Sequence, residues 1–250
     1  MGSESTQELG SLAGRIAVVT GASGGIGRAI AVALSREGVH VCALGRNSIG
    51  LAKTVAAAQK YSQATEFQGD LTLEEDLQAL LVHLESAGRL DILIHCAGVI
   101  HQDVMERARI ENLDLQYSTN VRAPYLLTQR LLPLLIAERG QIVFINSTVG
   151  LAAKRPDIGQ YAATKHALKA IAESLREEVN PKGIRVLSVY LGRTATPMQE
   201  RLFRQEGHEY HPDALLQPED IASVVVHTLL LPPTAEVTEI TIRPMRKTFT

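Results

Sequence analysis

The feature that most constrains the fold of this chain is a regular alternation of short apolar runs and longer helical stretches. Most of the apolar runs are nearly continuous in Val, Ile, Leu and Ala, as in strands that are buried on both faces of a parallel sheet. We predict strands at residues 15–20, 39–44, 65–69, 90–95, 141–145, 184–190 and 237–242. We predict helices between them, at residues 25–37, 48–61, 73–87, 110–138, 159–180 and 218–231.

Strands that alternate with helices of this length indicate right-handed crossovers and a doubly wound sheet. The predicted fold is therefore a single-domain, Rossmann-type α/β structure with about seven parallel strands and helices on both faces. Because no internal repeat or linker divides the chain, we expect one domain over residues 14–250, preceded by a flexible tail at 1–13. Residues 197–217 break the alternation, and we expect there either a lid over the substrate or a surface excursion with a short helix.

The composition narrows the class of protein. Hydrophobic residues make up 45% of the 250 residues and charged residues 21%, as in an ordinary globular core. The net charge is −2 and the sequence has no basic stripe, so we expect no nucleic-acid partner. The apolar runs are too short to cross a bilayer and the N-terminus does not resemble a signal peptide, so we expect no membrane association. Cys42 and Cys96 are expected to be free thiols in a cytoplasmic protein.

A glycine-rich turn follows the first predicted strand and opens the first predicted helix. Its sequence is Thr20-Gly21-Ala22-Ser23-Gly24-Gly25-Ile26-Gly27. Glycines allow a ligand to approach the backbone, and the free N–H groups of the helix then face a pyrophosphate. The spacing Gly-x-x-x-Gly-x-Gly differs from the common dinucleotide fingerprint, and a tight turn without a ligand is the alternative. The position of the turn favours a dinucleotide site.

The end of the second predicted strand bears on the choice between NAD and NADP. An acidic residue there would accept a hydrogen bond from the adenosine ribose and repel a phosphate, but the position holds Gly45. Arg46 follows, and its planar cation suits a 2′-phosphate, although a solvated loop arginine is the alternative. We therefore predict NADP(H) as the cofactor, with NAD(H) as the less favoured option.

Tyr161 and Lys165 stand four residues apart, so on a helix they project from the same face. A phenol with a pKa near ~10 is a poor base at neutral pH. We expect the ammonium of Lys165, if about 4 Å away, to lower the pKa of the phenol by up to about three units. Tyr161 is then the predicted acid–base group of the reaction.

These motifs resemble the short-chain dehydrogenase/reductase family. The resemblance rests on the glycine turn, on Tyr161-Ala162-Ala163-Thr164-Lys165 and on Ser147 upstream, and it covers the chain after about Leu12. Asp70, Asn120 and the segment Leu191–Thr196 also match family motifs. His95 and Cys96 replace two asparagines that the family usually has, and Leu191 replaces a proline.

The resemblance implies roles for the matching residues. Asn120, Ser147, Tyr161 and Lys165 would be catalytic: Ser147 would bind the substrate oxygen, with Thr148 as the alternative, and Asn120 would bind a water that links Lys165 to solvent. Lys165 would also hold the nicotinamide ribose. The implied cofactor contacts are Gly21, Ser23, Gly24, Gly25, Ile26, Gly27, Arg46, Asn47, Asp70, Leu71, Ala97, Gly98, Asn120, Tyr161, Lys165, Gly192, Thr194 and Thr196. Family members commonly form homodimers or homotetramers through helices that correspond to residues 113–136 and 163–175.

The predicted function is hydride transfer between NADP(H) and a small-molecule carbonyl/secondary-alcohol pair. An NAD-dependent dehydrogenase of the same fold and a non-catalytic dinucleotide-binding protein are the alternatives. Lys154 and Arg155 border the expected substrate pocket, where they could select an anionic substrate or be ordinary exposed cations. His208 and His211 have no suitable third ligand nearby, so we expect no metal.

Overall fold

The fold was analysed in a computed structural model, which describes residues 10–85 and 88–246. Within these residues, seven parallel strands form one sheet in the order β3-β2-β1-β4-β5-β6-β7. The strands are β1 Ile16–Thr20, β2 His40–Gly45, β3 Ala64–Gln68, β4 Ile92–His95, β5 Gln141–Ser147, β6 Arg185–Leu191 and β7 Glu239–Ile242. The predicted doubly wound fold is confirmed, with every predicted strand within two residues of an observed one.

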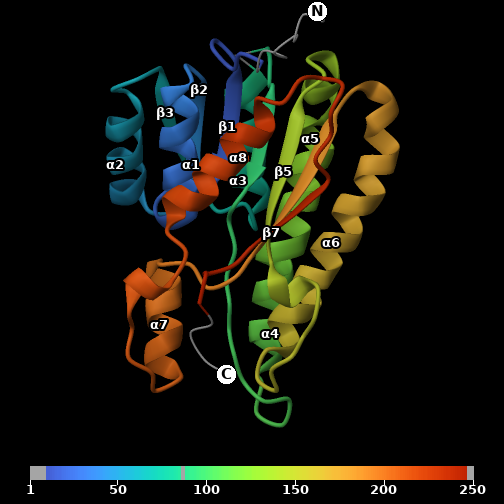
Figure 1. Cartoon of the computed structure of the whole chain (residues 1–250). Helices are drawn as coiled ribbons and strands as arrows, with labels where there is room; N and C mark the ends of the chain where they lie inside the picture. The colour runs from blue at the N-terminus through green and yellow to red at the C-terminus, as the bar shows by residue number, and fades with distance from the viewer. Residues whose placement is uncertain (1–9, 86–87, 247–250) are drawn as a thin grey trace, which may run out of the picture.

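Helices cover both faces of the sheet (Figure 1). They are α1 Gly25–Arg36, α2 Ser48–Ala58, α3 Glu74–Glu85, α4 Ile110–Tyr117, α5 Ala123–Ala137, α6 Gly159–Val179, α7 Pro197–Gln205 and α8 Pro218–Leu229. One apolar cluster joins α1, α2 and α8 to one face, and a second joins α3, α5 and α6 to the other. Two hydrophobic layers therefore hold the sheet between them.

Burial on both faces explains the continuous apolar runs of the sequence. Successive side chains of a strand point to opposite faces of the sheet. In β1, Val19 belongs to the cluster under α1 and α8, whereas Val18 belongs to the cluster under α3 and α5. Ile92 and Leu93 divide in the same way in β4. A polar residue at any of these positions would lie in a core, so β1 and β4 are almost entirely apolar.

The strand order places a crevice at one edge of the sheet. β1 pairs with β2 on one side and with β4 on the other, so the chain connections leave in opposite directions from this point. Ligands of doubly wound sheets bind outside the carboxyl ends of the strands at such a switch point. In Figure 1 this edge faces down, and α7 lies beyond it.

Two expectations about the chain need correction. Leu12, predicted to lie in a flexible tail, is buried in the core, and the Gly10 N–H donates to the Leu230 carbonyl at 2.8 Å. Residues 1–9 of that tail lie outside the described residues. The single helix predicted at 110–138 is divided by a π-helical segment, η1 Ser118–Arg122. Residues 197–217 contain a short helix, α7, whose Phe203 is buried.

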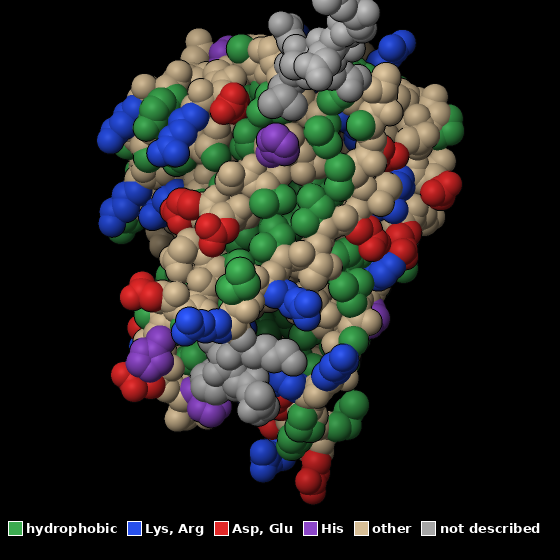
Figure 2. All heavy atoms as spheres, viewed as in Figure 1, with side chains coloured by type: hydrophobic (Ala, Val, Ile, Leu, Met, Phe, Trp, Pro, Cys, Tyr) green, Lys and Arg blue, Asp and Glu red, His purple; other side chains and the backbone are tan. Residues whose placement is uncertain are grey.

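The length of the helices and the distribution of surface charge concern the expected absence of membrane and nucleic-acid partners. Within the described part of the chain, no helix combines the length and the apolar character needed to span a membrane. On the face shown in Figure 2, Lys and Arg side chains are interspersed with Asp and Glu. This face therefore carries no continuous basic stripe.

Candidate active site

The glycine turn between β1 and α1 has the backbone conformation that its sequence predicts. Gly21 and Gly25 have φ values of +67° and +51°, in the left-handed region that side chains rarely adopt. A Cβ at Gly21 would lie 2.8 Å from the Ala97 nitrogen, and one at Gly27 would lie 2.4 Å from the Gly21 carbonyl oxygen. The turn therefore requires glycine both for its dihedral angles and for the close approach of β4.

Arg28 stabilises this turn through hydrogen bonds to the turn and to α2. It was not identified from the sequence. Its guanidinium donates to the carbonyl of Ser23 at 2.6 Å and to the carbonyl of Gly50 at 3.2 Å. It also donates to the hydroxyl of Thr54 at 3.0 Å. The signal available in the sequence was its position directly after the last glycine of the turn. Three contacts from one planar group tie the turn to α2.

Thr20 connects the turn to the end of β4. Its hydroxyl accepts hydrogen bonds from the backbone nitrogens of Cys96 at 3.0 Å and Ala97 at 3.1 Å. The side chain is buried. Because these are the first residues after β4, the contact holds Ala97 and Gly98 beside the glycine turn, where both were predicted to face the cofactor.

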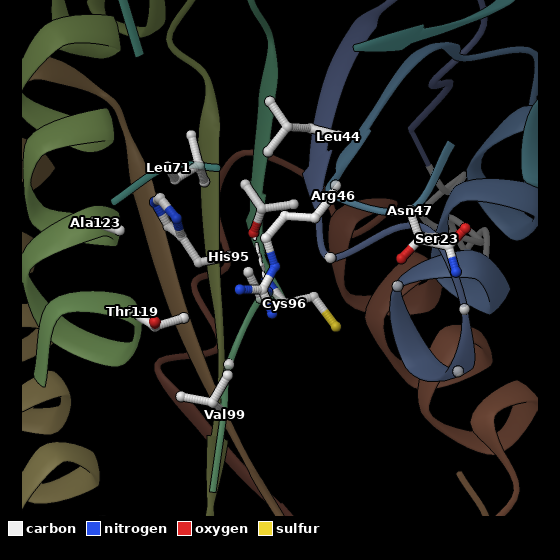
Figure 3. A pocket seen from close by; sticks show the side chains of 18 of the residues that line it. Ser23, Leu44, Arg46, Asn47, Leu71, His95, Cys96, Val99, Thr119 and Ala123 are labelled. Carbon is white, nitrogen blue, oxygen red and sulfur yellow. Dashed lines mark hydrogen bonds between the residues drawn. The ribbon is translucent and has the colours of Figure 1, made fainter. Parts of the chain in front are cut away.

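A cavity of about 520 Å³ extends along the carboxyl edge of the sheet in front of the glycine turn. In Figure 3, Ser23 and Asn47 lie on one side of it and Leu71, His95 and Ala123 on the other. The predicted cofactor residues in its lining are Gly21, Ser23, Gly24, Gly25, Ile26, Gly27, Arg46, Asn47, Asp70, Leu71, Ala97, Gly98 and Thr196. Most of the predicted contacts thus meet in one cavity, although they come from separate parts of the sequence.

Arg46 lies at the mouth of this cavity beside Asp70. Its guanidinium is 3.4 Å from the Asp70 carboxylate, and 60% of its side chain is exposed. Partial burial alone would raise the pKa of Asp70, but hydrogen bonds from Thr72 and the charge of Arg46 lower it below its ordinary value. Asn47 caps α2, because its side-chain oxygen accepts from the Gly50 nitrogen at 2.9 Å. The cationic group of Arg46 is therefore accessible at the end of β2.

Tyr161, Lys165 and Ser147 lie together in a second cavity of about 780 Å³. The Lys165 Nζ is 5.7 Å from the centre of the Tyr161 ring and donates to the Ile145 carbonyl at 3.2 Å. The Ser147 hydroxyl lies in the same cavity, 3.5 Å from the Leu191 carbonyl. The second cavity shares Ile26, Cys96, Gly98, Thr196 and Met198 with the first, so the two are adjacent.

Burial governs the protonation of this pair. It raises the pKa of Tyr161 to about 12, although the Ser147 side chain lowers it. It also lowers the pKa of Lys165 to about 8. The predicted fall in the phenol pKa is therefore wrong for this state of the protein, because removal of the phenol from water outweighs its neighbours. Tyr161 is a neutral phenol that keeps its proton.

Asn120 lies in the π-helical segment that interrupts the predicted helix. The Ala123 N–H donates to the Ser118 carbonyl five residues earlier, and Pro124 has no N–H to donate to the Asn120 carbonyl. The Asn120 side-chain oxygen accepts from Val99 N at 2.8 Å, and its nitrogen donates to Val99 O at 2.9 Å. That nitrogen also donates to the hydroxyl of Thr164 at 3.1 Å. The buried amide thus joins the segment after β4 to α6, immediately beside Lys165.

Asn146 positions α6, the helix that carries Tyr161 and Lys165, and was not selected from the sequence. Its side-chain nitrogen donates to the Lys165 carbonyl at 3.1 Å, and its oxygen accepts from the Ser147 nitrogen at 2.8 Å. The residue is buried at the end of β5. One side chain therefore sets the distance between Ser147 and Lys165. Its place directly before Ser147 was the available signal.

His95 and Cys96, which stand where the family usually has two asparagines, have different surroundings. His95 is buried, stacks on Phe144 at 4.8 Å and shares a hydrogen bond of 2.8 Å with Thr128, and burial lowers its pKa to about 3. Cys96 lines both cavities, and burial raises the pKa of its thiol to about 12, although Lys165 opposes this. Both groups are therefore uncharged near neutral pH.

The segment after β6 closes the second cavity. Gly192 and Thr194 line it, together with Thr196. A Cβ at Gly192 would lie 2.9 Å from the Pro244 ring, so glycine is required where the chain after β7 passes. Thr196 caps α7 by accepting from the Gln199 nitrogen at 3.2 Å. The hydroxyl of Thr148, the alternative to Ser147, is 3.3 Å from the Leu191 carbonyl.

Comparison with known proteins gives consistent matches over almost the whole chain. The model of a family described as short chain dehydrogenase matches residues 15–207. An uncharacterized oxidoreductase of Staphylococcus epidermidis is 32% identical over 233 residues, which are 92% of this chain and 97% of that protein. A farnesol dehydrogenase of Aedes aegypti is 33% identical over 246 residues, 95% of this chain and 98% of that protein. A crystal structure of a short chain dehydrogenase from Burkholderia cenocepacia in complex with NADP has a TM-score of 0.81 and 27% identity, covering 92% of this chain and 97% of that chain.

Proposed function

Because this chain belongs to the short-chain dehydrogenase family, and is therefore an oxidoreductase, we propose that it interconverts a carbonyl and a secondary alcohol with NADP(H). The observation that carries the proposal is the placement of Ser147, Tyr161 and Lys165 in a cavity that adjoins the glycine-turn cavity at Cys96 and Gly98. A dinucleotide along the glycine turn would reach the phenol at this junction.

The residues of the first cavity suit NADP(H). The glycine turn offers backbone N–H groups at the start of α1 for the pyrophosphate, and Arg46 offers a guanidinium for the 2′-phosphate. Gly45 leaves no carboxylate at the end of β2 to repel that phosphate. The NADP complex of the Burkholderia cenocepacia relative supports the same choice. When bound, the nicotinamide supplies or accepts the hydride.

The residues of the second cavity suit proton transfer. In the reductive direction, Tyr161 donates its proton to the oxygen of the carbonyl group, and the high pKa of the phenol keeps that proton available. Ser147, which lines the same cavity as Tyr161, donates to the same oxygen and orients it. Lys165 stabilises the phenolate that forms. Asn120 joins the segment after β4 to α6 through its hydrogen bonds with Val99 and Thr164, beside Lys165.

Two further parts of the proposal concern the rest of the chain. Residues 197–217 form the lid of the substrate cavity, since Met198, Leu202 and Glu206 line it. The protein assembles as a homodimer or homotetramer, supported by the exposed apolar side chains of Leu115, Tyr117 and Tyr125 along α4 and α5. Light scattering at micromolar concentration tests the assembly.

The experiment that tests the function combines binding and turnover. Fluorescence titration with NADPH and NADH measures cofactor binding, and a panel of ketones and secondary alcohols measures turnover by nicotinamide absorbance. We expect tighter binding of NADPH and reduction of at least one ketone. Binding without turnover of any compound would favour a non-catalytic dinucleotide-binding protein, and tighter binding of NADH would favour the NAD-dependent alternative.

A further inference from the structure

A cluster of four charged side chains forms one wall of the second cavity. The carboxylate of Glu206, just after α7, lies between two arginines: Arg155 is 2.8 Å from one oxygen and Arg193 is 2.8 Å from the other. Asp157 completes the cluster through two contacts with Arg155, at 2.7 and 3.2 Å. All four residues line the cavity that holds Ser147 and Tyr161.

The cluster is held firmly in its arrangement. The Glu206 side chain is only 10% exposed, and the Arg193 guanidinium lies 4.7 Å above the ring of the buried Phe203. Burial alone would raise the pKa of Glu206, but the two arginines outweigh it and keep the carboxylate ionised. Partial burial would lower the pKa of Arg155, but its carboxylate partners raise it. These charges are therefore present together at neutral pH.

The formal charges of this wall cancel. Two guanidiniums face two carboxylates, and with histidine counted as neutral His208 adds none. The remaining charged residue in the lining is Lys165, which lies at the other functional group of the cavity, beside Tyr161. Lys154, considered from the sequence as a possible anion-binding cation, is exposed. The positive charges of the two arginines are thus balanced by the two carboxylates before a substrate enters.

A carboxylate brought to this wall would add an unmatched negative charge next to Glu206. A partly buried charge without a counter-charge is unfavourable, and displacement of Glu206 would break two charge-assisted hydrogen bonds. Much of the remaining lining is apolar and accepts an uncharged group without such a cost. These side chains are Ile100, Val149, Ile158, Leu191, Met198 and Leu202.

We infer that Glu206 determines substrate specificity, by neutralising Arg155 and Arg193 so that the cavity selects uncharged carbonyl substrates over carboxylates. This inference rests on the proposed function, because it assumes that the cavity beside Tyr161 receives the substrate. Glu206 does not touch the reacting atoms. Its role is to set the charge of the wall that the remainder of the substrate meets.

The test uses one keto skeleton in two charge states, acetoacetate and ethyl acetoacetate, with the full-length protein at pH 7. The readouts are kcat/KM with NADPH and, independently of turnover, Kd from calorimetry in the presence of NADP⁺. The variants are Glu206→Gln and Asp157→Asn, each of which removes one negative charge from the wall. The control is Glu200→Gln, which removes the same charge from an exposed ion pair with Arg204 on the same helix.

We expect the unmodified protein to prefer the ester at least tenfold in both readouts. Glu206→Gln should lower that ester-to-acid ratio at least tenfold and Asp157→Asn at least threefold, whereas Glu200→Gln should leave it within twofold. If Glu206→Gln lowers the melting temperature, which would indicate that α7 is destabilised, the conclusion is drawn from Asp157→Asn instead. Unchanged ratios in both variants, or a parent protein that binds both probes equally or neither, would overturn the inference. A Kd ratio that behaves as expected without turnover of either probe would count against the proposed function and not against the charge selectivity of the cavity, which would then be a property of ligand binding alone.

Discussion

The Lys165 Nζ lies 5.7 Å from the centre of the Tyr161 ring, and between α6 and the ends of β5 and β6 Lys165 is buried and Tyr161 is half-buried. Burial moves their two pKa values apart, from the ordinary 10.0 and 10.5 to about 12 for the phenol and about 8 for the ammonium. Each group therefore holds its charge less readily here than in water. The pair is suited to donate a proton from a neutral phenol and to compensate the resulting negative charge with the lysine.

This arrangement predicts that Tyr161→Phe lowers kcat for ketone reduction by two or more orders of magnitude, because no other group is placed to donate the proton with Ser147. Binding of NADPH should change less than threefold, since the ring remains in place. Stopped-flow turnover and fluorescence titration measure the two quantities. Tyr61→Phe, which removes the hydroxyl of an exposed tyrosine after α2, is the control and should have no effect. Retention of more than a tenth of the activity in Tyr161→Phe would show that another group donates the proton.

The lowered pKa of Lys165 predicts how the reductive rate depends on pH. Below about pH 8 the amine is protonated and can stabilise phenolate, and above it that charge is lost. Because the pKa of Tyr161 is about 12, the phenol stays protonated throughout. We expect kcat/KM for reduction to be level from pH 6 to 7.5 and to fall with a single ionisation near pH 8. In Lys165→Arg, whatever activity remains should show no fall up to pH 9.5, since a guanidinium keeps its charge. The same fall in this variant would assign the ionisation to a different group.

Arg46 is predicted to separate the two cofactors. Its side chain is largely exposed and already lies against Asp70, so its contribution comes from a charge-assisted contact at the cavity mouth. Arg46→Ala should raise the KM for NADPH at least tenfold and change that for NADH less than twofold. Arg107→Ala, at a similarly exposed arginine paired with Asp103, should change neither. Equal effects of Arg46→Ala on both cofactors would rule out recognition of the 2′-phosphate.

The parts of the structure that could be predicted from the sequence are those determined locally. Val18 and Val19 are both apolar because β1 is buried on both faces, and the pattern of a buried strand is visible within five residues. Tyr161 and Lys165 could be paired because four residues on a helix define a common face. The glycine turn was recognisable because Gly21 and Gly25 need positive φ.

The parts that could not be predicted depend on contacts across the fold. Glu206 and Arg155 are 51 residues apart in the sequence. They meet because α7, which contains the buried Phe203, packs against the rest of the fold. The π-helical segment at Asn120 was not expected, because the apolar periodicity continues through it. The pKa of Tyr161 was misjudged for a similar reason: the spacing to Lys165 is local, but the burial that raises the pKa of the phenol depends on the surrounding fold.

Arg28 offers a last test, of whether the rigidity of the glycine turn limits cofactor binding. Its guanidinium makes three hydrogen bonds, to the carbonyls of Ser23 and Gly50 and to the hydroxyl of Thr54. A lysine keeps the charge but cannot supply this planar set of donors. Arg28→Lys should therefore cost about 2 kcal/mol of stability, seen as a fall of roughly 4–8 °C in melting temperature, and should raise the Kd for NADPH at least fivefold. The matched control is Arg36→Lys at the exposed end of the same helix, which should shift neither quantity by more than a small amount. A loss of stability with unchanged NADPH affinity would mean that the turn keeps its binding conformation without Arg28, supported by Thr20 and by the glycines alone.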